Sequence, residues 1–182
     1  MITTTLNRIR EHSPCPAGWE KLLKHLGKTG PDDEVLPFSE IVQAIGIDDA
    51  LWCCRAEPQY DKEWRLFAVW CARRVQHFMT EPRSINALDV AEQHALGNAT
   101  DKELFDAWAA AWVAADTAAY VAGAAARAAA RAARVAARAA DAAAYVAGSA
   151  ARAVGDAARD AARAAGGAER QAQADKFLEV VG

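Results

Sequence analysis

The sequence lacks a long uncharged apolar run, a secretory leader and the cysteine spacings of disulfide or zinc frameworks. Crossing a bilayer takes about 18 consecutive apolar residues, and the alanine-rich tract that comes closest is interrupted repeatedly by arginine. The N-terminus has no basic segment followed by an apolar one, so we expect no signal peptide. The four cysteines include an adjacent pair but no CxxC spacing (Cys15, Cys53, Cys54 and Cys71). These absences predict reduced thiols in a cytoplasmic protein with no membrane partner.

Patterns typical of catalytic and metal sites are missing as well. The four histidines are isolated in sequence, without HxxxH or HExxH spacing (His12, His25, His77 and His94). The sequence 27–29 reads GKT but lacks the first glycine of a phosphate-binding loop. No serine elbow or carboxylate pair stands out. We therefore expect a protein that is not an enzyme and has no metal or cofactor. A thiol enzyme that pairs Cys15, Cys53 or Cys54 with a distant histidine stays open as an alternative.

The net charge is small, and the charged residues are unevenly placed along the chain. The net charge is -3 at pH 7. Residues 120–165 hold seven arginines and three aspartates, which gives 7 - 3 = +4 and leaves -3 - 4 = -7 for the remainder. A general nucleic-acid binder would be basic throughout, so we expect no DNA binding. A basic segment within an acidic protein indicates a discrete anionic ligand or an acidic protein partner.

Helical periodicity is present throughout, and no stretch alternates apolar and polar residues as a strand would. The patterns predict helices over 16–26, 40–45 (capped by Ser39), 49–56 (capped by Asp48), 61–79, 84–96 and 168–181. Residues 1–15 are polar, and the prolines at their end hold 13–16 extended. Thr100 and Glu103 form a capping box that begins the alanine-rich region, where Trp108 and Trp112 add hydrophobic mass. The fold class is therefore all-α. The helical N-terminal part spans 1–99, and the alanine- and arginine-rich part spans 100–182. The two parts are expected to form one composite, compact domain.

More than half of the residues between Ala107 and Ala165 are alanine, and the other residues follow a helical rhythm. Asp116–Arg127 recurs as Asp141–Arg152, an offset of 25 residues. An unbroken helix over 101–165 would be about 100 Å long at 1.5 Å per residue. We therefore expect long alanine-rich helices that fold back as a hairpin or bundle. Apolar faces left uncovered by that packing predict a homodimer.

The first candidate site is a stripe of cations and phenols on these helices. Successive steps of four and three residues return to one side of a helix. The stripe follows Arg127, Arg131, Arg134, Arg138, Asp141, Tyr145, Gly148 and Arg152. Its candidate ligand-binding residues are the five arginines and Tyr145, together with Tyr120, seven residues before Arg127. Arg127 to Arg138 has four cations and no acid between them, so a phosphate or carboxylate ligand or an acidic helix is expected to neutralise them. The alternative is that these arginines only keep an alanine helix soluble.

The second candidate site combines arginines with tryptophans in the N-terminal part. The motifs LWCCRA (51–56) and WRLFAVWCARR (64–74) bring the two residue types together. Its candidate ligand-binding residues are Trp52, Arg55, Arg65, Arg73, Arg74 and His77. Converging guanidinium groups beside indoles would form a pocket for an anion or an aromatic ligand. The alternative is that the tryptophans, leucines and cysteines form the core while the arginines extend to solvent.

The chain resembles a family of phage and bacterial immunity proteins with alanine-rich C-terminal helices. The motifs that carry the resemblance are HSPCPAGW (12–19), IDDALWCCRA (47–56), RLFA (65–68) with CARR (71–74), and GNAT (97–100) leading into alanine and arginine helices. The resemblance covers nearly the whole chain. It implies a small cytoplasmic helical protein of bacterial conflict systems, often encoded by phages. It implies no catalytic residue.

These observations together predict a non-enzymatic binding protein that acts in the bacterial host cell. The first hypothesis is a phage anti-defence protein that sequesters an anionic small molecule, such as an immune signalling nucleotide. The alternative is an immunity or inhibitor protein that blocks a toxin or defence effector by protein–protein contact.

Overall fold

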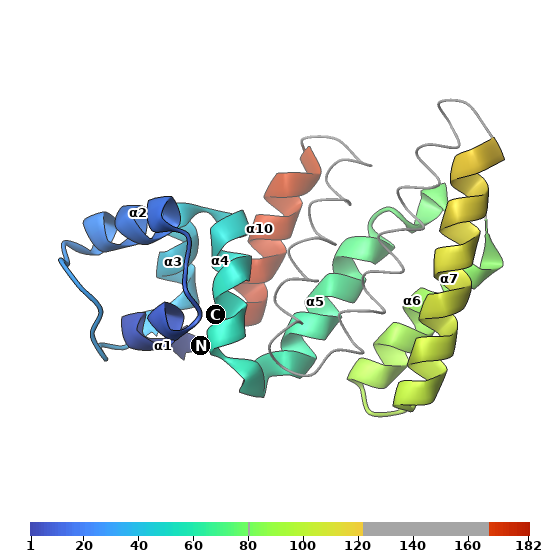
Figure 1. Cartoon of the computed structure of the whole chain (residues 1–182), viewed down its shortest axis with the longest axis horizontal. Helices are drawn as coiled ribbons and strands as arrows, with labels where there is room; N and C mark the ends of the chain where they lie inside the picture. The colour runs from blue at the N-terminus through green and yellow to red at the C-terminus, as the bar shows by residue number, and fades with distance from the viewer. Residues whose placement is uncertain (80, 122–167) are drawn as a thin grey trace.

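A computed structural model describes residues 1–79, 81–121 and 168–182 (Figure 1). The described residues form eight α-helices, so the predicted all-α fold is confirmed for this part of the chain. The helices are α1 (Leu6–Glu11), α2 (Pro16–Leu26), α3 (Phe38–Ile45), α4 (Ile47–Cys53), α5 (Asp61–Arg73), α6 (Pro82–Ala95), α7 (Asp101–Val121) and α10 (Ala168–Val181). The 3-10 turns are η1 (Cys54–Ala56), η2 (Pro58–Tyr60) and η3 (Gln76–Phe78).

Two short strands, which the sequence does not predict, join the first segment to the start of α3. β1 (Thr3–Thr4) pairs antiparallel with β2 (Leu36–Pro37), with Thr3 opposite Pro37 and Thr4 opposite Leu36. Next to β1, the Ile2 amide donates to the Val181 carbonyl at 2.6 Å, and this bond holds the N-terminus beside the C-terminus. Both ends of the chain therefore lie together near the middle of the molecule (Figure 1).

Several helix boundaries differ from the predictions. The sequence does not predict α1 within the polar segment 1–15, whereas in the structure Thr5 caps this helix and its Leu6 and Ile9 are buried. α3 begins at Phe38 and α4 at Ile47, so neither Ser39 nor Asp48 is an N-cap. α5 ends at Arg73, not at residue 79; a 3-10 turn follows. Val75 is still buried after the helix ends, which explains why the apolar periodicity overran the helix.

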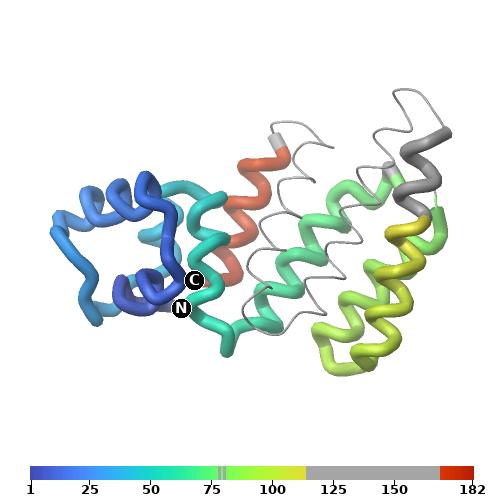
Figure 2. Tube along the Cα trace, in the orientation of Figure 1, coloured from blue at the N-terminus to red at the C-terminus, as the bar shows by residue number. Residues whose placement is uncertain are grey.

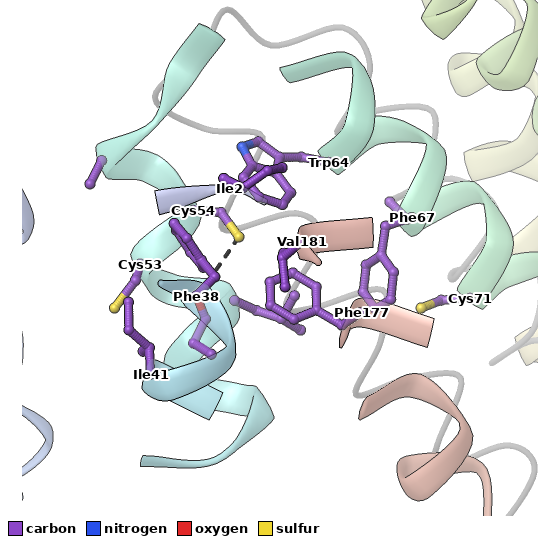
Figure 3. Close-up of a cluster of buried hydrophobic side chains, with 14 of the residues drawn as sticks. Ile2, Phe38, Ile41, Cys53, Cys54, Trp64, Phe67, Cys71, Phe177 and Val181 are labelled. Carbon is purple, nitrogen blue, oxygen red and sulfur yellow. Dashed lines mark hydrogen bonds between the residues drawn. The ribbon is translucent and has the colours of Figure 1, made fainter. Parts of the chain in front are cut away.

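The larger hydrophobic core has an aromatic centre between α3, α5 and α10 (Figure 3). Phe38, Trp64, Phe67 and Phe177 are buried, and their ring centroids lie 5.3–6.2 Å apart where they meet. Such separations are typical of favourable aromatic contacts. α10, the last helix in sequence, therefore completes a core that the first 70 residues begin.

A second, smaller core consists mainly of alanine and lies between α5, α6 and α7. Its buried residues are Val69, Ala87, Ala91, Leu104, Ala107 and Ala111. α6 and α7 form a hairpin at the opposite end of the molecule from α1 and α2 (Figure 2). The predicted capping box begins α7, because Glu103 accepts from the Thr100 amide at 2.7 Å and the Glu103 amide donates to Thr100 Oγ1 at 3.2 Å. In the described part of the chain, no helix is long and apolar enough to span a membrane.

Candidate binding surfaces

Arg73 connects α5 to α6 through an ion-pair network. Its Nη2 lies 2.7 Å from both Asp89 Oδ1 and Glu92 Oε2, and its Nη1 donates to Gln76 at 3.0 Å. Two carboxylates thus surround one guanidinium. The arrangement neutralises the cation from within the protein, so an external anion would have to displace an acid to reach it.

Arg74, the next residue, connects α5 to α10 instead. Its Nε donates to both carboxylate oxygens of Glu169, at 3.3 and 3.1 Å, and Glu169 is only 5% exposed. The guanidinium also lies 5.6 Å from the centroid of the Trp70 ring. A charge-assisted contact with a buried acid stabilises the docking of α10.

Arg65 lies one helical turn after Asp61 and forms an ion pair with it. Its Nη1 also lies 3.5 Å from His94 Nδ1, and His94 Nε2 contacts Asp101 at 2.8 Å. Burial raises the pKa of the Asp61 carboxyl, and the Arg65 charge partly opposes that rise. These polar contacts connect α5 to the hairpin of α6 and α7.

Arg55 packs on Trp52, one turn before it at the end of α4. Its guanidinium carbon lies 4.1 Å from the ring centroid, and its Nε donates to the Trp52 carbonyl at 2.9 Å. This is the pair of predicted site residues that the structure brings into contact. A similar pair joins α1 to α2, where the Arg10 guanidinium lies 5.7 Å from the centroid of the Trp19 ring.

The remaining predicted residues do not join this pair. Arg65 and Arg73 lie at the contact between α5 and α6, Arg74 lies at the contact between α5 and α10, and His77 lies in η3 with its side chain exposed. Tyr120 belongs to α7, but its side chain lies outside the described residues. The other predicted residues of the stripe lie outside them as well (Arg127, Arg131, Arg134, Arg138, Tyr145 and Arg152). Within the described part, Arg65, Arg73 and Arg74 are therefore distributed over two interfaces between helices, and they form no common pocket with Arg55.

Pockets lined by described residues are small. One between α5, α6 and α10 has a volume of about 270 Å³ and includes Arg73 and Lys176, both already in ion pairs with acids. A second, beside Lys28 and Glu34, measures about 170 Å³. Pockets for drug-sized ligands usually occupy about 300–1,000 Å³. Neither of these two pockets has the size expected for a nucleotide site.

A third pocket of about 60 Å³ lies where α1, α2, α3 and α4 meet. Trp52 lines this pocket, so a second predicted site residue, besides Arg73, borders a cavity. The sequence did not single out Trp19 or Asp49, which line the pocket from α2 and α4. Their positions are 30 residues apart, and only the packing of α2 on α4 brings them together. No local motif could have identified them as a pair.

The second surface that the sequence did not identify is an aromatic face of α7, which consists of Phe105, Trp108, Trp112 and Val113. The expectation that Trp112 belongs to the core mass is wrong, because Trp112 is 42% exposed, Phe105 59% and Val113 56%. The rings contact one another along the helix: Phe105 and Trp108 are tilted with centroids 5.6 Å apart, and Trp108 and Trp112 are stacked with centroids 6.2 Å apart. The spacing of these residues in the sequence was the signal that could have identified this face. Leu104, Ala107 and Ala111 share the buried side, and Phe105 and Trp112 lie seven residues apart on another.

The cysteines are free thiols, as their spacing predicts. Burial raises the pKa of Cys53 to about 12 and also raises the pKa of Cys54 and Cys71. These three thiols are therefore protonated at neutral pH and are poor nucleophiles. Cys15 is exposed and begins α2, where its Sγ accepts from the Gly18 amide at 3.3 Å.

The described residues contain no group of three or more histidines, cysteines and carboxylates that could hold a metal ion. Among the described residues, the surfaces best suited to binding are thus the exposed aromatic face of α7 and the small pocket lined by Trp19 and Trp52.

The chain has no significant match among protein-family models, curated proteins or solved structures.

Proposed function

We propose that this chain is a non-enzymatic immunity-type protein that blocks a protein partner by surface contact through the aromatic face of α7. The supporting observation is the row of contacting rings formed by Phe105, Trp108 and Trp112, of which Phe105 and Trp112 are exposed. Tryptophan and other aromatic residues are enriched among the residues that supply most of the binding energy at protein interfaces. The setting, a conflict between bacteria and phages or between a toxin and its immunity protein, comes from the family resemblance.

The construction of α7 favours recognition by a rigid surface. One side of the helix is fixed to α6 through Leu104, Ala107 and Ala111, and its first turn is capped by the Thr100–Glu103 box. The rings of this row also restrain one another by contact. A surface that is ordered before binding loses less conformational entropy when a partner docks.

The charge of α7 indicates the chemistry of the partner. The helix carries Asp101, Glu103, Asp106 and Asp116 against Lys102, which gives 1 - 4 = -3. Because α7 is acidic, charge complementarity predicts a partner whose apolar groove is bordered by lysine or arginine. An acidic partner remains the prediction for the arginine stripe, which lies outside the described residues.

The test uses a double variant of the aromatic face, Phe105→Ser with Trp112→Ser, and a matched control, Val35→Ser. Val35 is 67% exposed and lies on the loop before β2, away from α7. The wild-type protein is used to isolate a partner from infected or toxin-producing cells, and the partner is identified by mass spectrometry. Calorimetry with the purified partner then measures the affinity of all three proteins.

We expect the double variant to lose at least about 30-fold in affinity, since losing an interface hot spot costs about 2 kcal/mol. The control is expected to bind like the wild type. An affinity within threefold of the wild type for the double variant would exclude α7 as the contact surface. Light scattering of the isolated protein tests whether the same face pairs two copies of this chain, as the homodimer prediction requires.

Sequestration of an anionic ligand is the second candidate function, because Arg127 to Arg138 carries four cations with no acid between them. The arginines of α5 are engaged with acids, so this hypothesis now depends on the stripe. Calorimetry against cyclic and ADP-ribose-type nucleotides tests it. Binding that disappears in the Arg131→Gln, Arg134→Gln double variant would support it, and an absence of heat with every nucleotide would count against it.

A further inference from the structure

The small pocket between α2 and α4 is walled almost entirely by apolar groups. Its walls include the indole rings of Trp19 and Trp52, together with Leu22 and Ile45. Its volume is about 60 Å³, and a water molecule needs about 10–15 Å³. The pocket therefore has room for a group of about four or five non-hydrogen atoms.

Asp49 places a carboxylate in this apolar wall. A Cβ atom built on Gly18 would lie 3.5 Å from Asp49 Oδ2 and 3.0 Å from Cys15 Sγ, so these groups crowd the same side of the pocket. Among the described residues, no hydrogen bond or ion pair engages the Asp49 carboxylate, whereas its neighbour Asp48 pairs with Arg170. A half-buried anion without a counter-ion favours a cation in the adjacent space.

The two indoles favour the same kind of ligand. The face of a tryptophan ring attracts cations, and aromatic walls beside a carboxylate are the means by which proteins recognise alkylammonium groups. Both rings already contact guanidinium groups, at 5.7 Å for Arg10 on Trp19 and 4.1 Å for Arg55 on Trp52. These contacts show that each ring can accept a cation in this environment.

We propose that this pocket binds an alkylammonium group through Trp19, Trp52 and Asp49. A trimethylammonium head or the end of a lysine side chain matches both the volume and the charge. The group can belong to a free small molecule or to a residue of a partner protein. The proposal is independent of the aromatic face of α7, which lies at the other end of the molecule.

The first experiment compares choline with 3,3-dimethyl-1-butanol, which has nearly the same shape and no charge. Cys15 supplies the readout, because it lines the pocket and is exposed, whereas Cys53, Cys54 and Cys71 are buried. Occupancy of the pocket is measured as slower alkylation of Cys15 by iodoacetamide, followed by peptide mass spectrometry. Indole fluorescence of the Cys15→Ser variant gives an independent measurement of binding.

We expect choline to protect Cys15 at millimolar concentration and the neutral alcohol to protect it far less. Asp49→Asn keeps the shape of the side chain and removes its charge, so it is expected to weaken choline binding about tenfold. Asp33→Asn, at an exposed carboxylate outside the pocket, serves as the matched control and is expected to change nothing. Equal protection by the alcohol, or unchanged choline binding in the Asp49 variant, would overturn the proposal.

Short peptides that contain lysine or trimethyllysine distinguish the two sources of the ligand. Protection of Cys15 by a peptide at concentrations well below those needed for choline identifies a side chain of a partner protein. Protection by choline alone identifies a free small molecule. If neither choline nor any peptide slows the alkylation, the pocket does not bind alkylammonium groups and the proposal is wrong.

Discussion

The aromatic core around Phe177 and the alanine contact between α6 and α7 pack helices by different means. In the aromatic core, four large rings are buried from three helices (Figure 3). In the alanine contact, methyl groups of Ala87, Ala91, Ala107 and Ala111 meet. Alanine allows helices to approach closely but buries little apolar area per residue. The first region is therefore expected to supply most of the stability.

The same difference explains where the candidate interface lies. Because alanines and Leu104 already cover α6, the large side chains of α7 are not needed to fill that contact. Phe105 and Trp112 lie on another side of the helix and remain exposed. A helix that packs through its smallest residues can thus present its largest ones to a partner.

Phe177→Ala is expected to have the largest effect on stability. It removes a buried ring that contacts Phe38, Trp64 and Phe67, and such a change typically costs 3–5 kcal/mol, about half the stability of a small domain. The matched control is Phe105→Ala, at an exposed position of α7. Its free energy of unfolding is expected to stay within about 0.5 kcal/mol of the wild-type value. Urea denaturation followed by circular dichroism measures both. Equal losses would contradict the contrast between the two regions.

Arg8→Met is expected to have the next largest effect, about 2–3 kcal/mol. Glu57 is fully buried, and its Oε2 forms an ion pair with Arg8 Nη1 at 2.8 Å. Without that cation, a buried carboxylate loses its counter-ion. The control, Arg83→Met, removes the partner of the more exposed Glu81 and should cost almost nothing. Recovery of stability in the Arg8→Met, Glu57→Gln double variant would attribute the loss to the uncompensated charge.

Ala91→Gly tests the alanine contact and is expected to cost about 1–2 kcal/mol, from helix propensity and one lost buried methyl group. Ala109→Gly on the more exposed side of α7 is the control and should cost about 1 kcal/mol from propensity alone. The difference between the two thermal denaturation results isolates the packing contribution. A loss of stability in Ala91→Gly as large as that in Phe177→Ala would show that the alanine contact contributes as much stability as the aromatic core.

The smallest effect is expected from the titration of Glu103 at the start of α7. Hydrogen bonds from the Thr100 amide, and then from its hydroxyl, lower the pKa of Glu103. Because the pKa is lower in the folded state, the stabilisation is complete above the usual pKa of glutamate and is lost as pH falls through the lowered value. Nuclear magnetic resonance titration of the side chain measures the shift, and Glu103→Gln should remove the pH dependence. A normal pKa would mean that the cap does not persist in solution.

Much of the local structure could be predicted because helix signals are local. Gly27, with φ +66°, ends α2 where the sequence places its end, and the Thr100–Glu103 box begins α7 as predicted. α1 was missed because a helix of six residues leaves little periodicity to detect. The strands were missed because two residues are too short to alternate.

The candidate sites were less predictable because their neighbours are distant in sequence. Arg73 and Arg74 look alike along the chain, yet their acidic partners lie 16 and 95 residues away. The pairing of Trp19 with Asp49 likewise depends on the packing of α2 on α4. Residue spacing can show which helix face carries an arginine, but it cannot show which acid meets it.

The sequence by itself determined the helical fold class, the caps and the uneven distribution of charge, because each depends on neighbours within a few residues. The tertiary structure decided which arginines are neutralised, which aromatic residues are buried and which line a pocket. Those properties depend on surfaces that meet only when α10 returns to α5 and α7 packs on α6. Burial and ion pairing are properties of such contacts, which is why the exposed face of α7 emerged only from the folded molecule.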